Sequence, residues 1–415
     1  MTTPLQQLKS TSTAPIVRQL LDDPELSPVR CLYIHIPFCF HKCHYCDFYS
    51  LVDTRDRQQP FTDRLGQELA ALAPLTQNQP LRTIFIGGGT PTLLQPALWT
   101  QLLRTLDDHF NLAAIHANDA EFSVECNPET ASPELFDILR AGGVNRLSMG
   151  AQSFNPRHLK TLERWHDPKS VPRAVALAKT AGIERTSVDL IFAIPGQTLP
   201  EWDADLATAL TLGTTHLSCY ALTYEPNTAM TARLKRGDFT PTDDDLEADM
   251  YEHTVKRCAD AGLDRYEVSN FAAPGHECAH NLAYWSQSSW LAAGPSASSH
   301  LLDPQGGGWR WKNQPRLDDY LHQNDNGHPR AIDLEPPDPS RLLSEQLMTA
   351  VRLREGIDLD QLLENTNEPT ANAVRRVAAD QLARGCLQES DSRLRPTDSG
   401  FLVADGLARE FLSVL

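Results

Sequence analysis

Short apolar runs alternate with longer amphipathic stretches between residues 32 and 222 of the chain. Strands are predicted at the short runs Leu32–Ile36, Thr83–Ile86, Glu121–Val124, Arg146–Met149, Thr186–Ile191 and His216–Leu222. Helices are predicted at the amphipathic stretches Phe61–Leu75, Leu98–Phe110, Pro133–Ala141 and Val171–Ala181. Because helices connect successive strands, the strands should be parallel, with right-handed crossovers. The pattern therefore predicts an α/β fold, a partial (β/α)6 TIM-like barrel.

Two changes in the pattern divide the chain into three parts. Residues 1–28 are polar and show little periodicity, which predicts a weakly ordered N-terminal arm. After Leu302 the chain becomes rich in glycine and proline, so we place a domain boundary near residue 335. The barrel, with an extension, then covers residues 29–334, and a small domain covers 335–415. Within the small domain, a winged-helix-like α+β fold is predicted from a helix, a hairpin and a helix at Ala371–Arg384, Leu387–Arg395 and from Asp398.

Composition narrows the classes of protein that fit this pattern. Hydrophobic residues make up 41% of the chain and charged residues 22%, which is typical of a globular protein. The formal net charge of −17 disfavours nucleic acid as a partner. No apolar run is long enough to span a bilayer, and the first 30 residues lack a secretory stretch, so we expect a cytoplasmic protein. In that compartment the nine cysteines should serve as metal ligands and buried thiols.

Three cysteines, Cys39, Cys43 and Cys46, follow the first predicted strand in one loop. Three thiolates can hold a [4Fe-4S] cubane and leave its fourth iron open to a ligand, as a catalytic zinc site keeps an open position. A zinc knuckle or unrelated thiols are the alternatives, but zinc motifs usually come as two separated pairs. We therefore predict an iron–sulfur cluster at the C-terminal end of the first strand, where such barrels carry their chemistry.

Polar or glycine-rich segments also follow the second, third and fourth predicted strands, and a polar residue lies within the fifth. Gly87–Pro91 follows the second strand, and its glycines would let the backbone approach a ligand closely, although a tight turn explains them equally well. Glu125 and Gln152 follow the third and fourth strands, and Asp189 lies within the fifth. Since the C-terminal ends of parallel strands meet at one mouth of a barrel, these groups should surround one ligand.

The segment Tyr33–Cys39, the cysteine triplet and Gly87–Pro91 resemble the radical-SAM superfamily, specifically its HemN and HemW branch, over about residues 30–415. The resemblance implies that Cys39, Cys43 and Cys46 ligate a [4Fe-4S] cluster that binds S-adenosylmethionine. Residues implied at the methionine end of this cofactor are Gly88, Gly89 and Thr90, with Tyr33 and Tyr45 packing around it. Residues implied around the rest of it are Glu125, Gln152, Arg164, Asp189 and Ala221.

Two further positions, Arg164 and Ala193, bear on how the cofactor would fit. The guanidinium of Arg164 suits the carboxylate of S-adenosylmethionine, although an arginine on a surface helix is the alternative. Ala193 stands where the family pattern usually has glycine, and its Cβ would narrow the approach of the backbone at that turn.

A later segment separates the two halves of the branch. His280, Asn281, Tyr284 and Trp285 look like the heme-binding signature of the chaperone half, in which the histidine would supply an axial nitrogen to heme iron while the aromatic pair covers the porphyrin. A packed core histidine is the alternative. Phe48 also favours the chaperone half, because the dehydrogenase half usually has a further cysteine at this position.

The resemblance therefore implies a heme chaperone that binds heme, a [4Fe-4S] cluster and S-adenosylmethionine and delivers heme to acceptor hemoproteins, with a reductant supplying electrons to the cluster. Peripheral association with membranes would come through those acceptors. The alternative is an oxygen-independent coproporphyrinogen III dehydrogenase, a radical-SAM enzyme that decarboxylates its substrate to protoporphyrinogen IX. An RNA-modifying enzyme is disfavoured by the negative net charge.

Overall fold

The predicted parallel barrel is present. The computed structural model describes residues 10–303, 307–323 and 325–415. Six neighbouring parallel strands are β2 (Cys31–Ile36), β3 (Thr83–Gly88), β4 (Glu121–Cys126), β5 (Arg146–Gln152), β6 (Arg185–Phe192) and β7 (His216–Ala221). Their order in the sheet follows their order in the chain, so each connection crosses over to the next strand. The strands and their register agree with the predicted partial (β/α)6 barrel.

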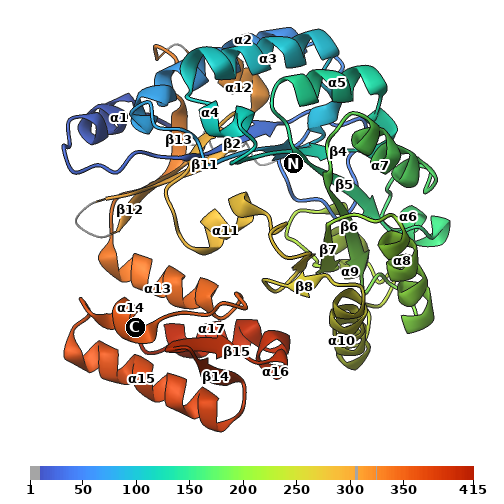
Figure 1. Cartoon of the computed structure of the whole chain (residues 1–415), viewed down its shortest axis with the longest axis vertical. Coiled ribbons are helices and arrows are strands. Elements are labelled where there is room, and N and C mark those ends of the chain that lie inside the picture. The colour runs from blue at the N-terminus through green and yellow to red at the C-terminus, as the bar shows by residue number, and fades with distance from the viewer. Residues whose placement is uncertain (1–9, 304–306, 324) are drawn as a thin grey trace.

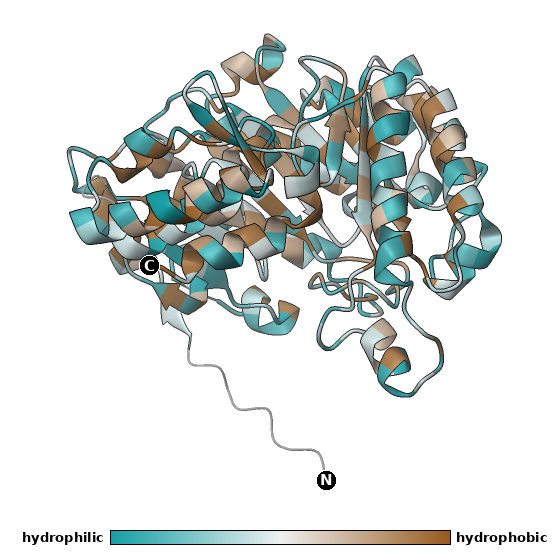
Figure 2. Cartoon of the chain, turned by 90° about the horizontal axis from the view of Figure 1, so that it is seen from below, coloured by the Kyte–Doolittle hydropathy of each residue, from teal (hydrophilic) through white to brown (hydrophobic). Residues whose placement is uncertain are grey.

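Helices cover the outer face of the curved sheet, as Figure 1 shows. The main ones are α2 (Gln58–Leu72), α3 (Pro96–His109), α5 (Pro133–Ala141), α7 (Ser170–Thr180), α8 (Leu199–Thr211) and α10 (Asp244–Asp260). Shorter elements between the strands are η1 (Ala73–Thr76), η2 (Pro91–Leu93), α4 (Ala113–His116), η3 (Pro128–Thr130), α6 (Pro156–Thr161) and α9 (Ala229–Lys235). In Figure 2 the apolar colour gathers on the strands and on the inner faces of the helices. The apolar faces of the amphipathic helices therefore pack against the strands and form the hydrophobic core between the two layers.

Local signals determine where several helices begin. Helix α5 begins after Ser132, whose side chain accepts a hydrogen bond from the backbone N–H of Leu135. Helix α8 begins with a capping box, in which Thr198 and Glu201 each accept from the other's backbone N–H. Such caps satisfy N–H groups that have no partner within the helix. The start of α5 agrees with the predicted helix Pro133–Ala141, whereas α8 was not among the predicted helices.

Short strands that the sequence did not predict extend the barrel at both edges. Strand β10 (Leu291–Ala293) pairs in parallel with β2, and at the other edge β9 (Asn270–Ala272) and β8 (Asp264–Arg265) add antiparallel strands. A separate antiparallel sheet has the order β1 (Thr11–Ser12), β13 (Arg330–Glu335), β12 (Gly308–Asn313) and β11 (Ser298–Leu302). Helix α11 (Ala279–Trp285) precedes β10, and α12 (Leu317–Leu321) lies between β12 and β13.

The N-terminal segment differs from the weakly ordered arm expected for residues 1–28. Residues 1–9 lie outside the described residues, but Thr11 and Ser12 pair with β13, and α1 (Ala14–Leu21) follows. Ile16, Val17 and Leu20 of this helix are buried in the barrel core. The segment is ordered because it closes the second sheet, a long-range contact that its polar composition does not reveal.

The C-terminal part of the chain has a hydrophobic core of its own. Its elements are α13 (Pro339–Ala350), α14 (Leu359–Leu363), α15 (Glu368–Ala383), β14 (Leu387–Ser390), β15 (Arg393–Pro396), α16 (Asp398–Leu402) and α17 (Ala404–Leu412). The helix, hairpin and helix predicted here are present, and Figure 1 shows them grouped beside the barrel below α11. The predicted boundary near residue 335 falls at the end of β13. None of the helices described here is long and apolar enough to cross a membrane.

Candidate functional site

The three cysteines of the first loop line one cavity. Cys39, Cys43 and Cys46 follow β2 and border a space of 430 Å³ at the C-terminal ends of the strands. The loop is held from both sides, because Cys39 N–H donates to Leu51 O at 2.9 Å and Thr90 N–H donates to Phe38 O at 2.7 Å. The structure thus brings the predicted ligands to one wall of a preformed cavity.

The cysteines beside the cavity are free thiols, the residue type that ligates iron as a thiolate. All nine cysteines are free thiols, and burial raises the pKa of Cys46 to about 11 and also raises the pKa of Cys39. Among the described residues, no group of three or more His, Cys, Asp or Glu side chains is arranged to hold a single metal ion. A zinc knuckle would need its ligands around one ion, whereas in a cubane each thiolate binds a different iron. Arg164 Nη1 lies 3.9 Å from Cys43 Sγ and adds positive charge beside the thiols.

The glycine segment at the end of β3 has a role that differs in part from the expected one. Gly88 and Gly89 line the cavity, but a Cβ on Gly89 would lie 2.7 Å from the carbonyl oxygen of Phe38. A Cβ on Gly88, whose φ is +113°, would lie 2.6 Å from the His35 ring. The glycines therefore let β3 approach the cysteine loop closely, in addition to leaving room for a ligand.

Two half-buried carboxyl groups, Glu125 and Asp189, lie at the strand ends. Glu125 Oε2 accepts a hydrogen bond from Gly88 N–H at 3.0 Å, and Asp189 Oδ1 accepts from Ser148 Oγ at 3.0 Å. Burial, and then repulsion from Asp189, raises the pKa of Glu125 to about 7. Burial also raises the pKa of Asp189. Such groups accept hydrogen bonds from ligand hydroxyls or amines, and a positively charged ligand would favour their ionised forms.

The other residues expected around S-adenosylmethionine are mostly in the same place. Tyr45, Thr90, Gln152, Arg164 and Ala221 all line the 430 Å³ cavity. Arg164 is anchored there, since its Nη2 donates to Gly150 O at 2.9 Å. The sequence reading of Arg164 as a surface residue is therefore disfavoured.

Ala193 lies just beyond the end of β6. Its φ is +58°, in the left-handed region that favours glycine, which explains why glycine is usual at this turn.

A larger cavity of 740 Å³ adjoins the first. Residues that border both are Lys42, Asp47, Phe48, Glu125, Ser148, Asp189 and Tyr220. Tyr33 lines only the larger cavity, where its ring stacks near Phe85 and His280, so it does not join the group around the cysteines as expected. The two cavities therefore share a wall that carries both half-buried carboxyl groups, Glu125 and Asp189.

His280 is buried in the wall of the larger cavity. Its Nδ1 lies 2.8 Å from the hydroxyl of Thr83 on β3, while its Nε2 is buried and has no hydrogen-bond partner within the described residues. Burial lowers the pKa of His280 to about 4, so the imidazole is neutral at physiological pH. Its ring makes an edge contact with Tyr284 at a centroid distance of 4.7 Å. One nitrogen is thus fixed, and the other is enclosed in the cavity wall and unpaired among the described residues.

The backbone of α11 is clamped at its start by Glu121 on β4. This carboxylate accepts from Ala279 N–H at 2.9 Å and from His280 N–H at 3.3 Å. Nearby Arg146 and Arg185 lower the pKa of Glu121 despite its burial. The clamp holds the histidine in a defined position relative to the sheet.

Trp285 is the one member of the predicted heme signature that does not line the larger cavity. The helical turn of α11 points it elsewhere, and Trp290 from the following loop lines the cavity in its place, with its ring centroid 4.3 Å from that of Tyr284. Sequence reasoning also missed Lys312 on β12, which lines the same cavity. Its place in an alternating strand, Gly308–Asn313, was the only available signal.

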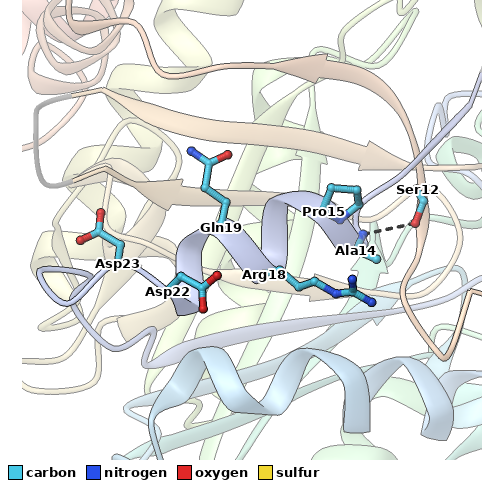
Figure 3. Close-up of a pocket in the computed structure, with 7 residues that line it drawn as sticks. All are labelled: Ser12, Ala14, Pro15, Arg18, Gln19, Asp22 and Asp23. Atoms are coloured by element: carbon cyan, nitrogen blue, oxygen red, sulfur yellow. Dashed lines mark hydrogen bonds between the residues drawn. The ribbon is translucent and has the colours of Figure 1, made fainter.

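A third cavity lies away from these groups. It measures 840 Å³, is shallow and lies along α1, where Arg18, Asp22 and Asp23 border it (Figure 3). At the start of this helix Ser12 Oγ accepts a hydrogen bond from Ala14 N–H at 3.2 Å. None of the predicted site residues lines it, so the two adjoining cavities are the candidate site.

Comparison with known proteins agrees with this geometry. The radical SAM superfamily pattern matches residues 33–209, and the HemN C-terminal domain matches residues 338–403. A protein of Mycobacterium tuberculosis named heme chaperone HemW is 36% identical to this chain, and the match covers 92% of this chain and 94% of that protein. A protein of the same name from Escherichia coli is 33% identical, and the match covers 93% of this chain and 99% of that protein. The fold resembles that of the solved radical SAM enzyme coproporphyrinogen III oxidase (HemN) of Escherichia coli, with a TM-score of 0.80 and 24% identity. The superposition covers 100% of this chain and 96% of that one. The chain therefore belongs to the radical SAM superfamily and, within it, to the HemW/HemN family.

Proposed function

We propose that this protein is a heme chaperone, which binds heme in the larger cavity and hands it to acceptor hemoproteins. The observation that carries the proposal is buried His280 in the wall of a cavity that adjoins the cysteine cavity, with an Nε2 that has no hydrogen-bond partner among the described residues. Relatives named heme chaperone HemW, similar over more than nine-tenths of the chain, support it.

In this proposal Cys39, Cys43 and Cys46 hold the [4Fe-4S] cluster that the radical SAM family implies, and S-adenosylmethionine occupies the 430 Å³ cavity beside it. Arg164 would hold the carboxylate of the cofactor, and Asp189 and Glu125 would accept from its hydroxyl and amino groups. Gly88, Gly89, Thr90, Tyr45, Gln152 and Ala221 would shape the remaining walls. The bound cluster supplies one-electron chemistry, and the protein's residues orient the cofactor and keep water out.

Heme would bind with its iron at His280. A hydrogen bond from Nδ1–H to the Thr83 hydroxyl would leave the lone pair on Nε2 for the iron, and such a second hydrogen bond makes a histidine a better ligand. Tyr284, with Trp290 beside it, would pack against the porphyrin. A volume of 740 Å³ lies within the range of about 300–1,000 Å³ typical of small-molecule sites.

The other expectations complete the proposal. The protein would act in the cytoplasm, with a reductant that reduces the cluster and with hemoproteins as acceptors. The barrel with its extension, residues 29–334, would carry both cavities, and residues 335–415 would form the small domain.

Heme titration of the anaerobically reconstituted full chain tests the proposal. The wild type should bind about one heme per chain, and His280→Ala should change the Soret spectrum because an axial nitrogen is lost, without loss of iron–sulfur absorption. Cys39→Ala should show the reverse, with loss of the cluster. Cys386→Ala is the matched control, since Cys386 is half-buried in the other domain.

The same sample should be incubated with coproporphyrinogen III, reductant and S-adenosylmethionine. No conversion is expected. Multiple turnovers to protoporphyrinogen IX, with heme uptake indifferent to His280, would make the chain a dehydrogenase instead.

A further inference from the structure

A cation that forms no ion pair with any described residue lines the larger cavity, outside the wall that this cavity shares with the cysteine cavity. Lys312 is half-buried on β12, where it pairs in register with Ser298, and both residues line the cavity. No acidic side chain within the described ranges forms an ion pair with Lys312, whereas Arg310, two residues earlier, binds Glu345 through two bonds of 2.7 Å each. The strand therefore presents one cation that the protein neutralises and one that it does not.

The surroundings of Lys312 favour an anionic ligand. An ammonium that is partly removed from water is destabilised unless a counter-charge accompanies it. The cavity's aromatic side chains, such as Tyr33, Tyr284 and Trp290, provide none. A ligand with a flat apolar body and a carboxylate would satisfy both the rings and the lysine.

The acidic groups of the cavity decide how such a ligand would lie. Asp47, Glu125 and Asp189 belong to the wall shared with the cysteine cavity, which Lys312 does not border. A ligand carboxylate would be repelled by these three groups and attracted by the lysine. Two other cations line the cavity, but Lys42 is exposed to solvent and Arg146 already interacts with Glu121 and Asp189. The charges thus favour a ligand whose carboxylate lies away from the cysteines and toward β12.

We propose that Lys312 binds a carboxylate side chain of the ligand in the larger cavity, which is a propionate if the ligand is heme. This assignment rests on the proposed function, and it makes Lys312 a determinant of specificity for tetrapyrroles with free carboxylates and of their orientation. Since a lysine acts as a point charge rather than a rigid fork, one carboxylate suffices.

Binding of heme and of heme dimethyl ester to the full chain tests the assignment. Lys312→Met should weaken heme binding about ten-fold, because a hydrogen bond to a charged group is lost. The ester should bind the wild type with similarly reduced affinity, and Lys312→Met should not weaken the ester further. Lys312→Arg, which keeps the charge, should retain most of the affinity for heme.

Lys256→Met is the matched control, since Lys256 is exposed on α10 and lines neither cavity; heme affinity should not change. Equal affinity of the wild type for heme and its ester would overturn the assignment without the use of any variant. So would a loss in Lys312→Met that is as large for the ester as for heme. If the wild type bound neither compound, the proposed function itself would fail, whereas heme binding that depends on His280 but not on Lys312 would refute only the lysine assignment.

Discussion

The hydrogen bond between Thr83 and His280 is the most direct structural test of the heme site. Thr83→Val keeps the shape of the side chain but removes the hydroxyl that lies 2.8 Å from His280 Nδ1. Both residues are buried, so water cannot replace the lost partner. Leaving a buried polar nitrogen unsatisfied costs about 1–3 kcal/mol, and the apoprotein should be destabilised by that amount. The heme complex should lose about ten-fold in affinity, because the histidine is no longer oriented by a second partner.

The assay is a heme titration followed in the Soret band, with calorimetric unfolding of the apoprotein alongside it. Thr186→Val is the matched control, since Thr186 on β6 is fully buried but its hydroxyl has no partner among the described residues. That replacement should leave heme affinity unchanged and stability unchanged or slightly raised. The reasoning would be refuted if both valine variants behaved alike, or if Thr83→Val bound heme as tightly as the wild type.

Two further predictions concern the wall beside the cysteines. Because the folded pKa of Glu125 is raised to about 7 from 4.5, the folded apoprotein holds a proton that the unfolded chain releases, so its stability should fall as pH rises from about 4.5 to 7. The free energy of unfolding, measured at pH 5 and pH 8, should therefore fall by roughly 3 kcal/mol at most in the wild type, and Glu125→Gln should remove this decrease. The same dependence on pH in both proteins would contradict the assignment. Gly89→Ala should lower iron incorporation as well as S-adenosylmethionine affinity, since its Cβ would press on the Phe38 carbonyl beside Cys39. Gly406→Ala, with open space around it, should leave both unchanged, and normal iron content in Gly89→Ala would show that the loop yields easily.

Three differences between expectation and structure have one physical origin. Residues 11–21 were expected to be weakly ordered, yet they close the second sheet and pack α1 into the core. Trp285 was expected in the heme site, but it does not line the larger cavity, and Trp290 from the loop after α11 does. Tyr33 was expected near the cysteines, but it lies beside His280. In each case the position of a side chain depends on contacts with distant parts of the chain, which local patterns do not encode.

The sequence by itself determined the parallel strands, the order of the connecting helices and the cysteine loop at the end of β2. Hydrophobic periodicity and close spacing are local properties, and the rule that strand ends share one mouth converts them into a site. Only the tertiary structure decided that two cavities adjoin, that Thr83 meets His280 across 197 residues, and that Lys312 lies in the larger cavity without an ion pair to any described residue. Those features arise when the short strands β10 to β13 pair with the barrel or with one another, and such pairing is set by packing rather than by the composition of each strand.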